Sequence, residues 1–267
     1  MKKAIAIVLV VLAAFAVFAS GSAEVKQSNK ITVGATPQPH AEILNLVIDD
    51  LAAQGITLVV KEFTDYVTPN EAVESGEIDA NYFQHIPYLE AQNKDKGFHL
   101  VNAGGVHIEP IALYSKKYKS LADLPKNAKI AIPNDPTNEG RALLLLASAG
   151  LITLADPSRL DSTPIDITSN PKNLSFTEVE AASLPRVLED VDAAVINGNY
   201  ALAAGLSSTK DGILVEGADS PYVNIVAVKA GNENKDAIKA LVKALQSDKV
   251  KKWISENYKN GEVIAVF

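Results

Sequence analysis

The segments Ile31-Thr-Val-Gly-Ala-Thr-Pro37 and Ile130-Ala-Ile-Pro-Asn-Asp-Pro136 decide the fold. Each is a short apolar run that leads into a proline-containing turn and then into a helical pattern. Two later pairs match in the same order: Phe63-Thr-Asp with Phe176-Thr-Glu, and Ile78-Asp-Ala with Val191-Asp-Ala. Each half therefore reads strand, helix, strand, helix, strand, with about fourteen extra residues in the second half.

This repeat predicts an α/β fold with two similar lobes, because strands alternate with helices in both halves. Open α/β lobes bind small ligands at the carboxyl ends of their strands, so the cleft between the lobes is the predicted site. We expect its lining to come from residues 34–41, 63–69, 82–85, 134–141 and 197–200. The extended runs 108–115 and 222–230 are predicted to cross between the lobes.

The predicted organisation follows from these crossings. Lobe I is expected over residues 31–115, lobe II over 116–217, and a return to lobe I over 218–267. Residues 235–258 have the apolar spacing of an amphipathic helix pair that packs on lobe I. Within this pair we expect Trp253 to be a packing residue.

Composition excludes several classes of protein. The 267 residues are 47% hydrophobic and 21% charged, which is typical of a soluble globular chain. The chain has no cysteine, which excludes disulfides, thiolate zinc sites and cysteine nucleophiles. A net charge of −7 without a run of five like charges argues against nucleic acid as a partner. Because the chain has only four histidines and no cysteine, we expect no bound metal, no cofactor and no catalytic residue. We also expect the protein to be a monomer.

The N-terminus predicts export. Lys2 and Lys3 precede an apolar run over 4–19 and then small polar residues, which is typical of a secretory signal over 1–23. The alternative is a buried N-terminal helix or a retained anchor. The polar residues 24–30 favour a tether, and loss of the two lysines changes the charge from −7 to −9. We therefore expect a periplasmic or cell-envelope protein.

A helix start over 134–141 is the first candidate binding element. Asn134 or Asp135 can cap the helix, Pro136 suits its first position, and the helix is predicted to end before Gly150. Asn138 and Arg141 are three residues apart and share one face. Together they suit a carboxylate, but the sequence equally allows Arg141 to pair with Glu139 or another surface acid.

Aromatic residues concentrate between positions 63 and 88. They are Phe63, Tyr66, Tyr82, Phe83 and Tyr88. At strand ends their faces can form an apolar slot for a soft or aliphatic side chain. We expect at least two of the five to be core residues, and Tyr88 to be the most structural of them.

Polar residues complete the candidate site. His85 follows a predicted strand and is assigned a hydrogen-bonding role, while Asn197 occupies the corresponding strand end of lobe II. Asn224 faces the cleft if its neighbours point inward. We interpret the other strand-like polar residues as structural: His99, His107 and Glu109. Asp79 and Asp192 are interpreted as capping or turn residues.

Several motifs in order resemble the NlpA/MetQ family of methionine-binding proteins of ABC importers. They are PQPHAEIL at 37–44, FTDY at 63–66, NYFQH at 81–85, NDPTNEGRAL at 134–143 and VINGNYA at 195–201. The resemblance covers residues 31–267. It implies a two-lobed, type II-like periplasmic-binding-protein fold that closes on L-methionine and delivers it to a membrane permease and ATPase.

The resemblance also implies roles for individual residues. Arg141 and Asn138 would hold the carboxylate, and Asn197 and Asn224 would meet the amino group and carboxylate. The thioether would be surrounded by Phe63, Tyr66, Tyr82, Phe83 and His85. Val17-Phe-Ala-Ser20 resembles a lipoprotein box without its acylated cysteine, so this sequence cannot be diacylated there. Alternative functions are binding of a methionine-containing dipeptide or another amino acid, surface adhesion, or an enzyme.

Overall fold

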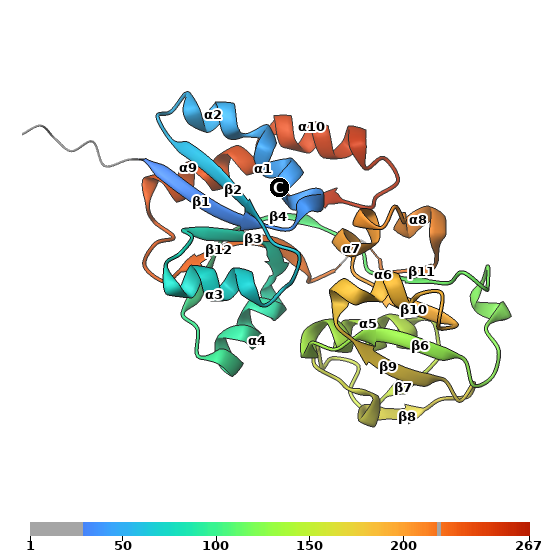
Figure 1. Ribbon diagram of the computed structural model, residues 1–267. Coiled ribbons are helices and arrows are strands. Elements are labelled where there is room, and N and C mark those ends of the chain that lie inside the picture. The colour runs from blue at the N-terminus through green and yellow to red at the C-terminus, as the bar shows by residue number, and fades with distance from the viewer. Residues whose placement is uncertain (1–28, 218–219) are drawn as a thin grey trace, which may run out of the picture.

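The computed structural model describes residues 29–217 and 220–267. Figure 1 shows two lobes side by side, each built on a mixed β-sheet with helices on its faces. The α/β fold with two lobes that the repeat predicted is therefore confirmed. The predicted signal over 1–23 lies outside the described residues, as does most of the predicted tether over 24–30.

Lobe I contains a six-stranded sheet. Its strands in spatial order are β13 (Ile264–Ala265), β4 (Leu100–Ile108), β12 (Val223–Lys229), β3 (Ala80–His85), β1 (Lys30–Ala35) and β2 (Thr57–Glu62). β1 pairs in parallel with β2 and β3, whereas β12 is antiparallel to both β3 and β4. The sheet is therefore parallel at one edge and antiparallel at the other.

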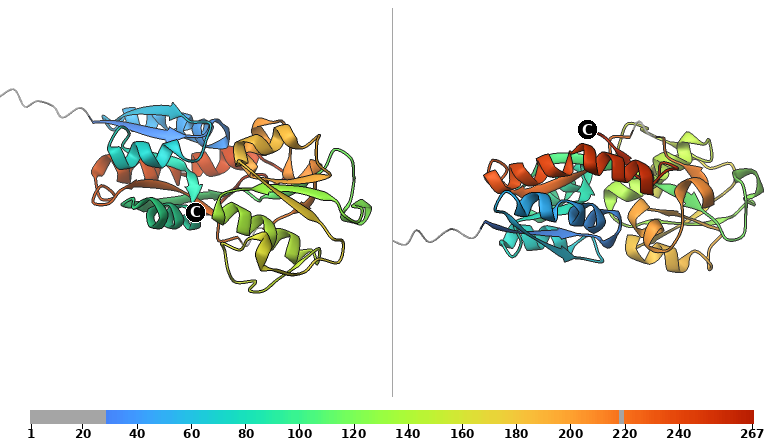
Figure 2. Two further views of the ribbon diagram at one scale, coloured as in Figure 1. Left: turned by 60° about the horizontal axis from the view of Figure 1, so that its bottom comes forward. Right: turned by 90° about the horizontal axis from the view of Figure 1, so that it is seen from above.

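The helices of lobe I cover both faces of this sheet. One face carries η1 (Pro37–Ala41), α1 (Glu42–Leu46), α2 (Ile48–Ala52), α9 (Asp236–Leu245) and α10 (Asp248–Asn257). The other face carries α3 (Thr68–Ser75) and α4 (Ile86–Lys96). Figure 2 shows α9 and α10 running along lobe I beside the N-terminal helices. The predicted terminal helix pair is confirmed, and Trp253 packs half-buried against Tyr258 and the lobe I core.

Lobe II contains a five-stranded sheet. Its order is β11 (Gly212–Val215), β5 (Ala112–Tyr114), β10 (Ala193–Ile196), β6 (Lys129–Pro133) and β9 (Ser175–Val179). The helical segments of this lobe are η2 (Leu121–Asp123), α5 (Pro136–Ser148), η3 (Pro164–Asp166), η4 (Ala181–Ser183), α6 (Leu184–Val187), α7 (Gly198–Ala203) and α8 (Ser208–Asp211). A separate pair, β7 (Thr153–Leu154) and β8 (Ile167–Ser169), lies between α5 and β9 in the chain. This pair accounts for the extra residues of the second half.

The order of the strands in the two sheets confirms the internal repeat. The residues that correspond in the structure differ by two positions from those matched in the sequence. The parallel strands run β2-β1-β3 in lobe I and β9-β6-β10 in lobe II. Val33 pairs with Ala80 just as Ile130 pairs with Ala193, so the structural equivalent of Ile130 is Val33 and not Ile31. A strand repeats its facing every two residues, so a shift of two matches the apolar pattern equally well.

Asp79 and Asp192 have the capping role that the sequence predicted. The Asp79 carboxylate accepts a hydrogen bond from the main-chain N–H of Thr32 at 2.8 Å. The Asp192 carboxylate accepts one from the main-chain N–H of Lys129 at 2.8 Å. Each aspartate thus joins the start of the third parallel strand of its lobe to the first.

The connections between the lobes differ in part from the prediction. Residues 109–111 link β4 to β5, within the predicted first crossing. The predicted second crossing over 222–230 is wrong, because these residues form β12 inside the lobe I sheet. The return crossing lies before them, after β11. The lobe I boundary predicted at residue 115 also falls too late, since β5 pairs with β10 and β11 in lobe II.

The helix predicted from residue 136 is present as α5. The Asp135 side chain caps it by accepting a hydrogen bond from the N–H of Asn138, and Pro136 occupies its first turn. The helix ends at Ser148, two residues before Gly150, which has a φ of 70°. These caps fix the first turn of α5 at the edge between the lobes.

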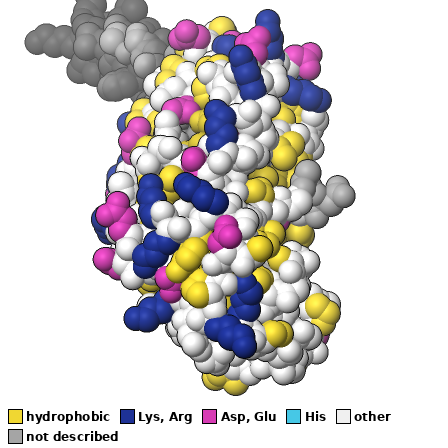
Figure 3. Space-filling model, turned by 90° about the vertical axis from the view of Figure 1, so that its right-hand side faces the viewer, with side chains coloured by type: hydrophobic (Ala, Val, Ile, Leu, Met, Phe, Trp, Pro, Cys, Tyr) yellow, Lys and Arg dark blue, Asp and Glu magenta, His cyan; other side chains and the backbone are white. Residues whose placement is uncertain are grey.

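The surface mixes both signs of charge. On the face shown in Figure 3, Lys and Arg side chains are interleaved with Asp, Glu and apolar side chains. Over the part of the chain that the structure describes, none of the helices is both long and apolar enough to cross a membrane.

Gly140 provides a test of how α5 packs. An alanine Cβ at this position would lie 2.2 Å from the main-chain oxygen of Leu160. We expect Gly140→Ala to destabilise the protein by about 1–3 kcal/mol, because main-chain atoms must move. Helix propensity alone predicts the opposite sign, a gain of about 1 kcal/mol. Urea unfolding measures the difference, and Gly217→Ala, with no atom within 4 Å of its Cβ, is the control. A stability equal to or above that of wild type would contradict the packing described here.

Candidate functional site

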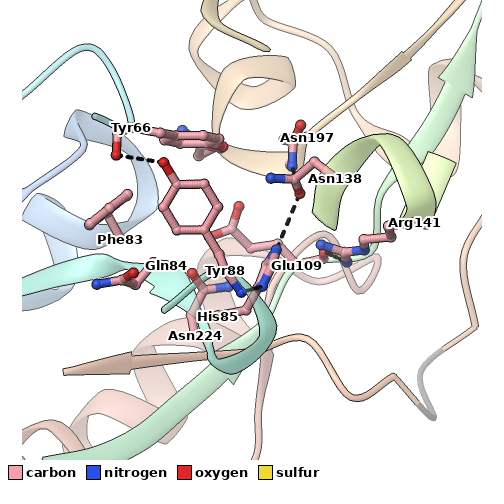
Figure 4. Close-up of a pocket in the computed structure, with 12 residues that line it drawn as sticks. Tyr66, Phe83, Gln84, His85, Tyr88, Glu109, Asn138, Arg141, Asn197 and Asn224 are labelled. Carbon is pink, nitrogen blue, oxygen red and sulfur yellow. Dashed lines mark hydrogen bonds between the residues drawn. The ribbon is translucent and has the colours of Figure 1, made fainter. Parts of the chain in front are cut away.

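A cavity lies between the lobes, at the carboxyl ends of β3 and β10, and its empty space is about 340 Å³ when space open to solvent is included. It is lined by Tyr66, Phe83, Gln84, His85, Tyr88, Glu109, Asn138, Arg141, Asn197, Gly198, Asn199 and Asn224. Figure 4 shows these side chains converging from both lobes. The predicted ranges 63–69, 82–85, 134–141 and 197–200 all contribute, whereas 34–41 does not.

Most of the predicted ligand-binding residues line this cavity. They are Tyr66, Phe83, His85, Asn138, Arg141, Asn197 and Asn224. The exceptions are Phe63 and Tyr82, which lie in the core of lobe I. Tyr82 and Phe83 are adjacent in β3, and successive strand side chains point to opposite faces, so Tyr82 points away from the cavity. Phe63 packs over Gly34, where a Cβ would lie 2.7 Å from its ring.

One end of the cavity is aromatic. The ring centroid of Tyr66 lies 5.7 Å from that of Phe83 and 5.9 Å from that of Tyr88. The Tyr88 hydroxyl donates to the main-chain oxygen of Tyr66 at 2.8 Å. Tyr88 was expected to be structural, but its place in α4 brings its ring into the cavity wall. The Tyr66 hydroxyl reaches across to lobe II and donates to Asn199 Oδ1 at 2.5 Å.

Arg141 dominates the other end of the cavity. Its Nε donates to Glu216 Oε1 at 2.9 Å, and its Nη2 donates to Glu216 Oε2 at 2.5 Å and to the Glu109 main-chain oxygen at 2.8 Å. Its guanidinium also lies 4.2 Å from the ring centroid of Tyr222. The alternative that the sequence allowed, pairing of Arg141 with an acidic side chain, is therefore present, with Glu216 as the partner and not Glu139. Among the described residues Nη1 has no hydrogen-bond partner.

Three asparagines surround this end but differ in what they can still bind. Asn138 is fully engaged: its Nδ2 donates to both oxygens of Asp135, and its Oδ1 accepts from Asn197 at 2.7 Å. Asn197 Oδ1 is buried and has no partner among the described residues. Asn224 Oδ1 lies 3.0 Å from His40 Nε2, and we find no acceptor in the described chain for its Nδ2. Asn197 and Asn224 therefore keep unused polar atoms at the cavity, whereas Asn138 does not.

His85 has the hydrogen-bonding role that the sequence predicted. Its Nδ1 accepts from the N–H of Tyr88 at 3.1 Å, which leaves Nε2 to donate to Asn138 Oδ1 at 3.2 Å. Burial, together with the charge of Arg141, lowers the pKa of His85 to about 3. The imidazole is therefore neutral at neutral pH, and it links lobe I to α5.

The other histidines separate into an exposed one and a buried pair. His99 is exposed and contacts Glu74. His40, His107 and Glu109 form a buried group whose ligand-type atoms lie within 4.8 Å of one another, so they are the residues that could hold a metal ion. His107 Nε2 hydrogen-bonds to Glu109 Oε1 at 2.8 Å. His40 Nε2 lies 3.2 Å from the same oxygen but hydrogen-bonds to Asn224 Oδ1 at 3.0 Å.

Sequence reasoning missed five residues of the cavity lining as ligand-facing positions: Gln84, Tyr88, Glu109, Gly198 and Asn199. Gln84, Gly198 and Asn199 lie inside predicted lining ranges, although none of the three was assigned to the ligand individually. Glu109 lies in the predicted first crossing, and an acidic residue at a lobe junction was the signal that could have found it. The contribution of His40, which reaches Asn224 across the sheet, had no local signal.

Comparison with known proteins agrees with this architecture. The model of the NlpA lipoprotein family matches residues 31–267. The D-methionine-binding lipoprotein MetQ of Escherichia coli is 46% identical over 89% of each chain. A solved nutrient-binding protein from Burkholderia cenocepacia bound to methionine is 50% identical, with a TM-score of 0.85, covering 89% of this chain and all of that one.

A solved lipoprotein from Treponema pallidum is 45% identical with a TM-score of 0.86, covering 89% of this chain and 99% of that one. These likenesses confirm the periplasmic-binding-protein fold that the sequence motifs implied. The family model spans both lobes and every residue that lines the cavity. The chain therefore belongs to the NlpA lipoprotein family.

Proposed function

We propose that this chain is an exported solute-binding protein that holds L-methionine in the interlobe cavity and delivers it to the permease and ATPase of an ABC importer. The observation that carries the proposal is the division of the cavity into an aromatic end and a polar end with unused hydrogen-bonding atoms. Two relatives support the same ligand class, the D-methionine-binding lipoprotein MetQ and the nutrient-binding protein that was solved bound to methionine.

The polar end suits the carboxylate of an amino acid. Arg141 Nη1 and Asn224 Nδ2 are donors at the cavity wall, and we assign the ligand carboxylate to them. A guanidinium binds a carboxylate strongly because its hydrogen bonds are charge-assisted. The Glu216 carboxylate accepts two hydrogen bonds from the Arg141 guanidinium and so fixes its orientation. The ligand carboxylate would be the second anion that this guanidinium binds.

The aromatic end suits a thioether. Sulfur contacts with aromatic rings contribute about 0.3–1.5 kcal/mol each, and Tyr66, Phe83 and Tyr88 provide three rings. A methionine-containing dipeptide stays the alternative ligand, and the panel below therefore includes one.

A ligand panel tests the substrate. At roughly 1 kcal/mol per heavy atom, the nine heavy atoms of methionine give about −9 kcal/mol, a sub-micromolar Kd. The full chain, refolded to remove any carried ligand, should be stabilised by about 4 kcal/mol at 1,000 times that Kd. Thermal unfolding with L-methionine, D-methionine, glycyl-methionine and leucine measures this. We expect the largest shift with L-methionine, and a larger shift with any of the others would replace it as the ligand.

Arg141→Lys tests the carboxylate assignment. Lysine keeps a charge opposite Glu216 but cannot supply Nη1, so we expect the Kd for methionine to rise by roughly ten- to a hundredfold. Arg159→Lys is the matched control, because Arg159 is exposed, pairs with Asp161 and Asp166, and does not line the cavity. Calorimetry measures both variants. Equal affinities for the two variants would remove Arg141 from the binding site.

A further inference from the structure

A second pocket lies in lobe II, at the opposite end of the sheet from the interlobe cavity. That cavity lies at the carboxyl end of β10, and β5 runs antiparallel to β10, so the carboxyl end of β5 lies away from it. The second pocket opens there, between the turn after β5 and α8, which lie on the right-hand side of lobe II in Figure 1. Its empty space is about 620 Å³ when space open to solvent is included. The two linings share no residue.

Three lysines line this pocket, and none of them forms a salt bridge in the described part of the chain. They are Lys116 and Lys119, on the turn after β5, and Lys210, on α8. A fourth lysine of the same region, Lys117, is outside the lining and lies 3.5 Å from the Asp192 carboxylate. The acidic residue of the lining is Asp211, so three lysines against one aspartate leave two positive charges in excess. The pocket is thus positively charged in a chain whose net charge is −7.

The two segments that carry these lysines are held by side-chain hydrogen bonds. The Ser115 hydroxyl donates to the main-chain oxygen of Asp192 at 2.6 Å and accepts from the N–H of Lys117 at 3.1 Å. At the start of α8, the Asp211 carboxylate accepts from the main-chain N–H of Ser207 at 2.8 Å. These bonds fix the main chain at both sides of the pocket before any ligand enters.

Part of the pocket wall is apolar, and one wall residue has an unused hydroxyl. Leu188, Leu206 and Ile213 belong to the lining. Tyr114 also belongs to it, and its hydroxyl is buried without a hydrogen-bond partner among the described residues. Burial, together with the nearby Asp211, raises the pKa of Tyr114, so the hydroxyl keeps its proton near neutral pH. A ligand oxygen that reaches Tyr114 would supply the acceptor that this donor lacks.

This combination suits a phosphate group that is attached to an apolar body. Lysine binds an anion as a point charge, and a phosphate monoester carries a charge of about −1.5 to −2 at neutral pH, whereas a carboxylate carries one negative charge. The lining contains no arginine, which is the residue that binds a planar carboxylate through two parallel hydrogen bonds. The apolar wall offers the substituent of the phosphate a surface to contact.

We propose that this pocket of lobe II binds a phosphate group, with Lys116, Lys119 and Lys210 as its cationic partners and with Leu188 and Leu206 against the apolar part of the ligand. The phosphate is carried by a small soluble ester or by a lipid headgroup. The site is separate from the interlobe cavity, so the inference does not depend on the ligand which that cavity holds.

Calorimetry with phenyl phosphate on the full chain at pH 7.5 tests the site. The triple variant Lys116→Gln, Lys119→Gln and Lys210→Gln should raise the Kd for phenyl phosphate at least about tenfold, because three attractions to the phosphate are lost. Replacing the same three lysines with arginine keeps their charges and should retain binding. Thermal unfolding shows whether each variant is folded.

The matched control removes three lysines elsewhere. Lys94→Gln, Lys96→Gln and Lys235→Gln together make the same change in net charge, and all three residues are exposed, belong to lobe I and do not line the pocket. This variant should bind phenyl phosphate within about twofold of wild type, because salt screens charges that lie farther than a Debye length away. Equal losses of affinity in the two glutamine variants would overturn the proposal.

The remaining measurements use wild type alone, so they decide the matter even if the variants do not fold. Benzoate has the same ring with a single negative charge and should bind at least about tenfold more weakly than phenyl phosphate. Benzoate that binds as tightly as phenyl phosphate, or no binding of phenyl phosphate at about 10 mM, contradicts a phosphate site.

A short-chain, water-soluble phosphatidylglycerol identifies the source of the phosphate, with phosphatidylcholine of the same chain length as the zwitterionic control. Binding of the phosphatidylglycerol and not of the control supports the site with a lipid headgroup as its ligand. Binding of phenyl phosphate and of neither lipid supports the site with a small soluble ester as its ligand.

Discussion

A polar group that is buried between two lobes must find a partner, and this requirement shapes the whole junction. The guanidinium of Arg141 is held by Glu216, the hydroxyl of Tyr66 by Asn199, and the imidazole of His85 by Asn138. Each lobe has its own apolar core, and these polar contacts between the lobes are joined by aromatic and apolar ones, such as Tyr66 against Tyr200. The atoms that this network leaves unpaired are the ones to which we assign the proposed ligand.

The fold was largely predictable because its parallel strands and helices are local features of the sequence. The apolar runs at 31–35 and 130–133, and the cap at Asp135, carry the pattern that places them. The pairing of β12 was not predictable, since it inserts between two strands made more than a hundred residues earlier. Long-range antiparallel pairing leaves no signal in the neighbouring residues, so β12 was mistaken for a crossing.

The residues of the site that lie at strand ends or helix starts could be predicted from the sequence. Whether an aromatic side chain points into the cavity or into the core could not. His85, Asn138, Arg141 and Asn197 each follow a strand or begin a helix, and all four line the cavity. Phe63 and Tyr82 belong to the same aromatic cluster, but the facing of β3 and the space over Gly34 place them in the core. In the sequence, Glu109 looks like an ordinary residue of an extended segment. Only the structure shows that its carboxylate is buried beside His40 and His107.

The position of β12 also has a consequence for the order in which the chain can fold. All five strands of the lobe II sheet come from one uninterrupted stretch, residues 112–215. In the lobe I sheet, β3 and β4 are joined only through β12, so this sheet is incomplete until β12 has been synthesised. Until then the edges of β3 and β4 are unpaired, and unpaired strand edges are prone to wrong pairing. The strand order therefore allows the lobe II sheet to be completed before the lobe I sheet, the reverse of the usual order in which the N-terminal unit folds first. The second lobe can therefore be complete while the first lobe still lacks the strand that joins its two halves.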